Sequence, residues 1–235
     1  MAKNIFRYIN IYYWLRKLSF SKFFQTFFLI PNYIKRNIIF YLIYKSKHWR
    51  DYKEPLVNES VSGLGSDLVV TKKIIKELDI FIKENNIRSI LDVACGDFNW
   101  IKFLIIKNSK IKYHGLEIVD KIVKNNKTLY SNSNVTFKCS DVVNDNLPQN
   151  YDLVILRDFF IHIKNDDIFN MLSKIKFSKC KYFAITNYPN VKENIDVKGY
   201  GHHRYINIEI SPFNLNNSFY KIDDYDKKLN IYKNI

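Results

Sequence analysis

Residues 89–100 read Ser-Ile-Leu-Asp-Val-Ala-Cys-Gly-Asp-Phe-Asn-Trp, and this stretch is the most informative part of the sequence. Residues 89–93 are mainly apolar, which is typical of a buried strand, and they lead into a turn at Cys95 and Gly96. Small residues let the backbone of such a turn approach a ligand closely, and glycine can adopt a positive φ. The turn has a single glycine, so it is not the Gly-x-Gly-x-x-Gly motif of dinucleotide-binding enzymes. The stretch predicts a strand, a ligand-binding turn and a helix.

Strands and helices alternate along the rest of the domain. Short apolar runs predict strands at residues 89–93, 112–118, 135–139, 151–156 and 181–186. Helical periodicity predicts helices at residues 68–85, 100–106, 119–130 and 166–175. This alternation favours an α/β fold with a doubly wound, mostly parallel sheet, which binds ligands beyond the carboxyl ends of its strands.

Length and composition fit one domain with an extension. The chain has 235 residues, of which 47% are hydrophobic, enough for a sizeable core. We expect a basic, aromatic helical extension at residues 1–55 and the α/β domain at residues 56–235. The widely spaced Cys95, Cys139 and Cys180 predict neither a zinc site nor disulfides, which fits a reduced, cytoplasmic setting.

The positive charge is concentrated near the N-terminus. The net charge is +14, and residues 1–50 hold ten Lys or Arg and no Asp or Glu. The rest of the chain has 27 basic and 23 acidic residues, so the domain itself is nearly balanced. An enzyme that acts on nucleic acid more often spreads positive charge around its cleft. The charge pattern therefore does not favour a nucleic-acid partner.

The extension has two interpretations. Residues 1–50 contain fifteen aromatic residues, and the longest uncharged stretch, residues 23–34, is too short to span a bilayer, which takes about 20 residues. No small-residue cleavage site of a signal peptide follows it. The segment is either a basic amphipathic anchor at the inner face of the membrane or a pair of helices packed on the domain. The sequence leaves both open.

Three acidic residues follow three successive predicted strands or end them. Asp92 lies late in the first strand, where it can reach the turn or an ammonium group of a ligand. Glu117 ends the second strand, where a carboxylate can accept both hydroxyls of a ribose. Asp141 follows the third strand and can accept a hydrogen bond from the amino group of an adenine. Together they predict a nucleoside site.

Asp158 and His162 are the candidate acid/base pair. They lie four residues apart after the fourth strand, so one helical turn would place them on one face. Imidazole titrates near neutral pH and suits proton transfer, with a carboxylate to orient it. The alternative is a packed histidine bonded to the backbone. The spacing does not decide which of the two side chains is the base.

The order of several motifs carries a more specific resemblance. These are Ser-Gly-Leu-Gly-Ser at residues 62–66, the stretch at residues 91–100, Leu-Arg-Asp at residues 156–158 with His162, Asn-Ile-Asp at residues 194–196 with Gly199, Arg-Tyr-Ile-Asn at residues 204–207 and Ser-Pro-Phe at residues 211–213. This order resembles a bacterial branch of the class I S-adenosylmethionine (SAM)-dependent methyltransferases that is associated with surface-polysaccharide gene clusters. The resemblance covers roughly residues 55–220. It implies a Rossmann-like, seven-stranded sheet and SAM as the cofactor.

The resemblance also implies a set of cofactor-binding residues. Asp92, Cys95 and Gly96 would line the methionine end, Glu117 the ribose, and Asp141 with Val142 the adenine. The full set is Ser62, Gly63, Gly65, Ser66, Asp92, Cys95, Gly96, Glu117, Ile118, Asp141, Val142 and Arg157. The sequence departs from the family at Leu64, where proline is usual, and at His203, where an aromatic residue is usual. The second departure bears on the choice of acceptor.

Residues 187–213 carry the polar groups expected on the acceptor side. Hydrogen bonds to a hydroxyl-rich ligand are expected from Asn194, Asp196, Arg204 and Asn207, and Trp100 belongs to the same predicted site. Alternatively, this segment is a hairpin in which the Asn and Asp side chains satisfy turns. Adjacent histidines rarely share one ion, so His202 and His203 predict no metal site.

The sequence thus predicts a methyltransferase that moves the SAM methyl group to an oxygen or nitrogen of a sugar or sugar-linked small acceptor, in surface glycan biosynthesis. Two alternatives are an RNA methyltransferase, suggested by the basic extension, and a catalytically silent accessory protein with the same fold. An enzyme that uses a nicotinamide cofactor is disfavoured by the single-glycine turn.

Overall fold

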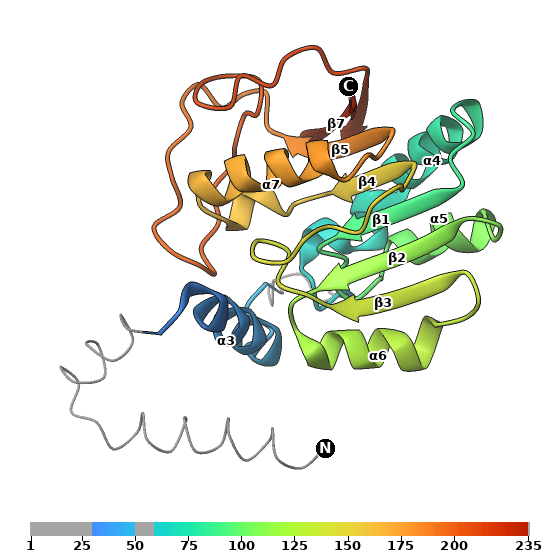
Figure 1. Ribbon diagram of the computed structural model, residues 1–235, viewed down its shortest axis with the longest axis horizontal. Helices are drawn as coiled ribbons and strands as arrows, with labels where there is room; N and C mark the ends of the chain where they lie inside the picture. The colour runs from blue at the N-terminus through green and yellow to red at the C-terminus, as the bar shows by residue number, and fades with distance from the viewer. Residues whose placement is uncertain (1–29, 50–58, 235) are drawn as a thin grey trace. The chain divides into compact units, whose positions relative to one another are not determined.

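The computed structural model describes residues 30–49 and 59–234 (Figure 1). The chain forms two compact units, residues 1–35 and residues 36–235. Helix α3 (Asn32–Ser46) begins in the first unit and ends in the second. Most of the extension predicted at residues 1–55 lies outside the described residues. Within the described ranges, no helix is both long enough and apolar enough to cross a membrane.

The second unit is built on a seven-stranded sheet with the order β3-β2-β1-β4-β5-β7-β6. The parallel strands are β1 (Ser89–Val93), β2 (Lys112–Glu117), β3 (Val135–Cys139), β4 (Leu153–Leu156) and β5 (Tyr182–Asn187). Strand β7 (Lys227–Lys233) runs antiparallel between β5 and β6 (Tyr220–Asp224). The predicted doubly wound, mostly parallel seven-stranded fold is confirmed.

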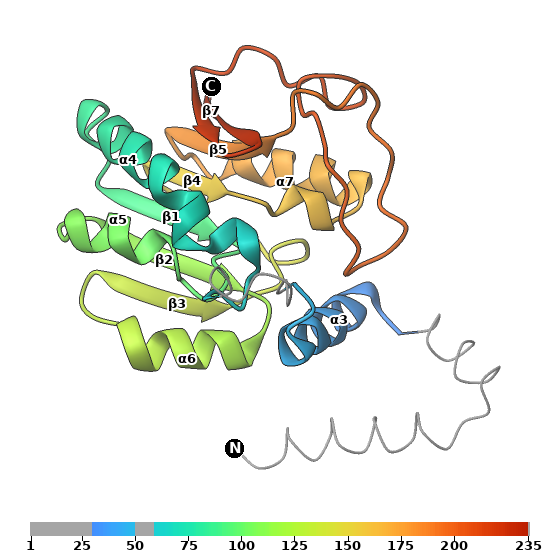
Figure 2. The same cartoon turned by 180° about the vertical axis from the view of Figure 1, so that it is seen from behind.

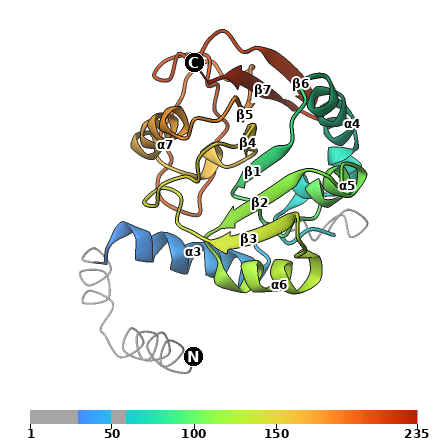
Figure 3. The same ribbon diagram turned by 45° about the vertical axis from the view of Figure 1, so that its right-hand side comes forward.

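Helices cover both faces of this sheet. Helices α4 (Leu68–Glu84), α5 (Ile101–Lys107) and α6 (Asp120–Tyr130) pack on one face, and α7 (Asn165–Phe177) packs on the other (Figures 1, 2 and 3). Short 3-10 helices η2 (Leu64–Ser66) and η3 (Phe160–His162) lie in the connections.

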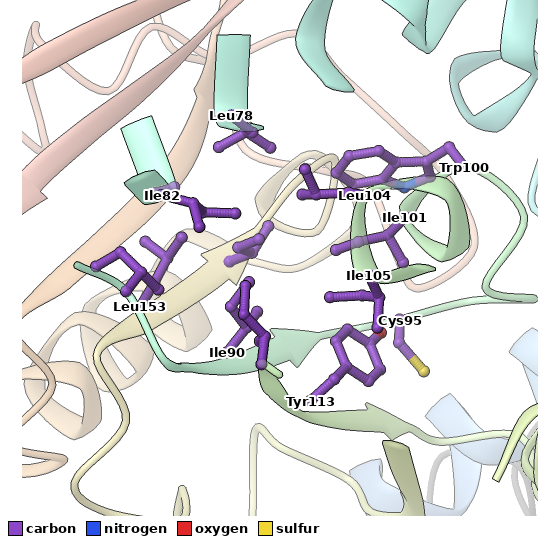
Figure 4. Packing of buried hydrophobic residues seen from close by; sticks show 14 of the residues in the cluster. Leu78, Ile82, Ile90, Cys95, Trp100, Ile101, Leu104, Ile105, Tyr113 and Leu153 are labelled. Carbon is purple, nitrogen blue, oxygen red and sulfur yellow. The ribbon is translucent and has the colours of Figure 1, made fainter. Parts of the chain in front are cut away.

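The two cores follow from strand alternation. Ile90 of β1 packs with α4 and α5, whereas its neighbour Leu91 packs in the α7 core. Leu153 and Val154 of β4 divide in the same way. Successive side chains of a strand point to opposite faces, so an unbroken apolar run serves both cores. Figure 4 shows the first core, with α4 and α5 residues facing the strands.

Sequence patterns located the five parallel strands, but residues 188–219 differ from expectation. The alternative of a hairpin within residues 187–213 is wrong, since residues 188–219 contain neither helix nor strand. The hairpin of this part of the chain is formed later, by β6 and β7.

Gly115 of β2 offers a test of this packing. It lies beside Asp92 in the sheet, and an added Cβ would be 2.7 Å from Cys95 Sγ and 2.9 Å from Phe137 Cδ1. We expect Gly115→Ala to lower the free energy of unfolding by about 1–3 kcal/mol, because it overpacks the core. Gly199→Ala is the control, since its Cβ would meet its nearest neighbour at an ordinary 3.8 Å. Equal urea midpoints for the two variants would contradict this packing.

Candidate active site

A cavity of about 790 Å³ opens beyond the carboxyl ends of the parallel strands. Such a volume suits a small-molecule site. Its wall includes every residue predicted for the cofactor, both members of the predicted acid/base pair, and Trp100: Ser62, Gly63, Gly65, Ser66, Asp92, Cys95, Gly96, Trp100, Glu117, Ile118, Asp141, Val142, Arg157, Asp158 and His162. Residues separated by 100 positions in sequence thus meet at one edge of the sheet.

The carboxylate of Asp92 is buried in the floor of this cavity. The hydroxyl of Tyr113 donates a hydrogen bond of 2.7 Å to its Oδ2. Burial raises the pKa of Asp92 to about 6, against the opposing effects of the Tyr113 hydrogen bond and the charge of Arg157. The carboxylate is therefore under-solvated and favours an approaching cation.

Glu117 is held by backbone donors at the end of β2. Its Oε1 accepts from the Val119 amide at 3.0 Å, and its Oε2 accepts from the Gly96 amide at 3.2 Å. Burial raises the pKa of Glu117 to about 7, although these hydrogen bonds lower it. The side chain links the β2 end to the turn after β1.

A serine-rich loop covers that turn. Asp97 accepts hydrogen bonds from the Ser60 hydroxyl and the Val61 amide, and its own amide donates to Ser62 Oγ at 3.0 Å. Gly96 has a φ of 55°, and an added Cβ would lie 2.3 Å from Ser62 Oγ. Glycine is therefore required in this turn for both conformation and space. Asp97, which was not among the predicted site residues, thus holds the loop to the turn.

Asp141 is paired with a residue from α3. Arg36 Nη2 donates to Asp141 Oδ2 at 2.7 Å, and Nε donates to Oδ1 at 3.1 Å. Arg36 itself lines the cavity, as do Phe40, Tyr44 and Trp49. The spacing of four between residues 36, 40 and 44 indicates that they share one helix face. It does not indicate that this face lines the cavity.

Arg157 lines the cavity, yet its guanidinium is committed to a buried ion pair. Nε and Nη2 donate to the two oxygens of Asp224, at 2.8 and 2.9 Å. The guanidinium also stacks 5.0 Å from the ring centre of Trp100. Arg157 thus fastens the end of β4 to the end of β6.

Asp158 adopts a left-handed backbone conformation, with φ of 55°, two residues after the end of β4. Its Oδ2 lies 3.0 Å from Lys227 Nζ and 3.5 Å from Arg157 Nη1. Burial raises the pKa of Asp158, but the charges of Lys227 and Arg157 outweigh it and hold the pKa below the usual value. The carboxylate of Asp158 is therefore held ionised between two cations.

His162 does not form the expected pair with Asp158. The left-handed residue interrupts the predicted helical turn, and no hydrogen bond joins the two side chains among the described contacts. His162 Nδ1 instead lies 3.4 Å from the carbonyl oxygen of His202, and the ring packs 5.1 Å from that of Trp49. Burial lowers the pKa of His162 to about 4, so the imidazole is neutral at pH 7.

The polar residues predicted on the acceptor side hold their own segment together. Asn194 and Asn207 exchange side-chain and backbone hydrogen bonds, and the amide of Asn165 donates to Asp196 Oδ1 at 3.0 Å. Arg204 donates to the carbonyl of Phe160 and to Asn165 Oδ1. None of these four belongs to the cavity wall, whereas Trp100, predicted for the same site, does.

Part of the cavity wall is aromatic, and the sequence did not predict it. Tyr188 and Tyr205 stack with ring centres 4.3 Å apart, beside His203 and Lys227, and Tyr225 completes this wall. Across residues 30–49 and 59–234, no three His, Cys, Asp or Glu side chains are grouped to hold a metal ion.

Comparisons with known proteins agree with this geometry. A protein-family model described as a methyltransferase domain matches residues 90–177. No curated protein matches the chain. The fold is similar to magnesium protoporphyrin IX methyltransferase (ChlM) from Synechocystis PCC 6803 with bound SAM, with TM-score 0.56 and 15% identity over 86% of this chain and 95% of that chain.

Two further solved structures have similar folds. A SAM-dependent methyltransferase from Clostridium acetobutylicum ATCC 824 has TM-score 0.54 and 16% identity, over 69% of this chain and 91% of that chain. The methyltransferase domain of bacterial CtHen1 has TM-score 0.53 and 13% identity, over 70% and 99%. Residues 90–177 are therefore matched by a methyltransferase domain, on a chain with the Rossmann-like fold of class I SAM-dependent methyltransferases.

Proposed function

We propose that the protein transfers a methyl group from SAM to an oxygen or nitrogen of a sugar or sugar-linked small acceptor, in surface glycan biosynthesis. One observation carries the proposal: the acids of three consecutive strand ends share a single cavity with a neutral imidazole. The first feature suits a nucleoside cofactor and the second suits proton removal from an acceptor.

The cavity wall fits this cofactor. Asp92 and the turn at Cys95 and Gly96 would hold the amino-acid end, and the two oxygens of Glu117 suit the two hydroxyls of a ribose. Asp141 would accept from the amino group of the adenine. When bound, SAM supplies a methyl group on a positively charged sulfonium, which makes that methyl electrophilic.

His162 is the proposed base. If Nδ1–H donates to the carbonyl of His202, Nε2 keeps its lone pair and takes the proton of the acceptor. Asp158 is not the base in this proposal, since its carboxylate is paired with Lys227 and Arg157. Neutral imidazole persists across the physiological range because the pKa of His162 is about 4.

The aromatic wall supports a sugar-like acceptor. The stacked rings of Tyr188 and Tyr205 present apolar faces with hydroxyls at their rims, and Lys227 Nζ lies 5.9 Å from the Tyr188 ring centre. Such surfaces combine stacking area with hydrogen bonding. The acceptor wall thus offers both to a sugar ring.

The first experiment is calorimetric titration of the full chain with SAM. We expect saturable binding and no binding of NADH. We expect Asp92→Ala and Glu117→Ala to weaken SAM binding at least tenfold, which corresponds to about 1.4 kcal/mol, because each removes a charged hydrogen-bond acceptor. Glu84→Ala, on the C-terminal end of α4, is the control. A folded protein that binds no SAM would refute the proposal.

The second experiment follows tritium from methyl-labelled SAM into sugar nucleotides, lipid-linked sugars or total RNA. We expect label in a sugar-containing acceptor. His162→Ala should lower the rate by about 10²–10⁴ while cofactor affinity is retained, because it removes only the base. With SAM at saturation, the wild-type kcat should be flat from about pH 6 to 8, since His162 is already deprotonated there. Label in RNA alone would favour an RNA methyltransferase, and binding without transfer a silent accessory protein.

We also propose that the extension rests on an anionic membrane surface. Residues 1–50 contain ten Lys or Arg residues and no Asp or Glu. In the described part of α3, Tyr41 and Leu42 are 40% and 45% exposed, next to the exposed Lys45. Exposed aromatic and aliphatic side chains flanked by cations suit an interface of this kind.

Sedimentation with phosphatidylglycerol vesicles tests the membrane proposal. We expect the full chain to sediment, and the double variant Arg16→Glu/Lys17→Glu to lose most of this binding because it reverses two charges. Lys72→Glu/Lys76→Glu, with the same charge change on exposed α4 positions, is the control. Equal sedimentation of the two double variants would rule the extension out as the binding element.

A further inference from the structure

From Arg36 onward, one face of α3 forms part of the cavity wall. Arg36, Phe40 and Tyr44 recur every four residues, and all three line the cavity. Residues at this spacing share one helix face. The two polar members contact two of the predicted cofactor-binding acids. Arg36 contacts Asp141, and Tyr44 Oη lies 3.4 Å from Glu117 Oε2.

Contacts independent of Arg36 fix this part of the helix. Asn37 Nδ2 donates to the carbonyl of Ile118, directly after β2, at 3.0 Å. Gly201, with φ of 85°, leaves room for Ile39 and Ile43, whose side chains would lie 2.7 and 3.0 Å from an added Cβ. These contacts fix the backbone of the helix at Arg36. The side chain of Arg36 therefore reaches Asp141 from a backbone position that does not depend on the ion pair.

The guanidinium is itself held on a second side. Arg36 Nη1 donates to Tyr200 Oη at 3.0 Å, and the guanidinium carbon lies 5.1 Å from the Tyr200 ring centre. The side chain of Arg36 is only 3% exposed and that of Asp141 is 15% exposed. Because Tyr200 holds the planar guanidinium, its two donors to Asp141 fix the plane of the carboxylate. A lysine ammonium has no such planar pair of donors and cannot do this.

The geometry leaves the carboxylate able to bind one further donor. An ionised Asp has two oxygens and about four lone-pair sites, and the fork of Arg36 occupies one edge of the group. Among the described residues, only Arg36 donates hydrogen bonds to the carboxylate of Asp141. The opposite edge stays available to a ligand on the cavity side.

We propose that Arg36 is a positioning residue that sets the base selectivity of the cofactor site. It holds Asp141 so that the free edge of the carboxylate accepts from the exocyclic amino group of adenine and repels a purine with an oxygen at that place. This inference rests on the proposed function, because it takes the ligand to be an adenosyl compound. It adds a residue of the extension to the determinants of cofactor choice.

The test compares two ligands of equal charge, S-adenosylhomocysteine and S-inosylhomocysteine, by calorimetric titration of the full chain. We expect the wild type to prefer the adenosyl compound more than tenfold. Arg36→Ala and Arg36→Lys should reduce the preference to less than threefold, because neither side chain makes a fork. Lys45→Ala, on the exposed side of the same helix, should keep the wild-type ratio.

The ratio separates positioning from folding. A general loosening of the fold weakens the binding of both ligands by a similar factor. Loss of the carboxylate's orientation instead changes the ratio of the two affinities. Asp141→Asn, whose amide can donate to the oxygen of the inosyl compound, should reverse the preference. Tyr200→Phe removes the acceptor of Nη1, together with a 3.5 Å hydrogen bond to Asp167, but keeps the fork on Asp141. This second, milder variant is expected to fall between wild type and Arg36→Lys.

The outcomes distinguish the two levels of the argument. A folded wild type that binds neither compound overturns the proposed function and this inference with it. A wild type that prefers the adenosyl compound, with Arg36→Ala, Arg36→Lys and Tyr200→Phe all keeping the same ratio, overturns this inference alone. Tighter adenosyl binding by Arg36→Ala also overturns it, since it would mean that Arg36 competes with the ligand for Asp141.

Discussion

The buried ion pair between Arg157 and Asp224 is the interaction on which the proposed acceptor side of the cavity depends. Both side chains are nearly solvent-free, with exposures of 3% and 0%, so the free-energy cost of desolvation is large and is offset only by good geometry. Two short hydrogen bonds supply that geometry and join β4 to the β6–β7 hairpin. The hairpin in turn carries Lys227 to Asp158 at 3.0 Å. An antiparallel addition to the sheet thus fixes the charge of an acid at the end of a parallel strand.

Hydrogen-bond donors from other elements also hold the acids on the side of the cavity proposed for the cofactor. Each acid at a strand end has a partner from another element: Tyr113 for Asp92, the Gly96 and Val119 amides for Glu117, and Arg36 for Asp141. These donors orient the carboxylates, yet burial still raises the pKa of Asp92 and Glu117. A cationic or donor-rich ligand is therefore favoured where the protein alone leaves the two acids under-solvated.

Sequence reasoning succeeded where the signal was local. The apolar run before Cys95 and the acidic residues Glu117 and Asp141 indicated where three strands end. Because these strands pair in parallel, their ends lie side by side. It did not indicate which polar residues bond within their own segment: Asn194 and Asn207 both donate to backbone carbonyls of an irregular segment. It also failed across distance, since nothing near Arg36 indicates a partner 105 residues away.

Helix α3 shows that the two interpretations of the extension are compatible from Arg36 onward. With 3.6 residues per turn, positions 36, 40 and 44 face one way while positions 41, 42 and 45 project elsewhere. The first set contacts the cavity and the second is exposed. A helix with both kinds of surface can pack on its own domain and still present cations and aromatic rings outward. The packed face is needed in any case, because without it the carboxylate of Asp141 would lose the only hydrogen-bond donor that the described residues give it.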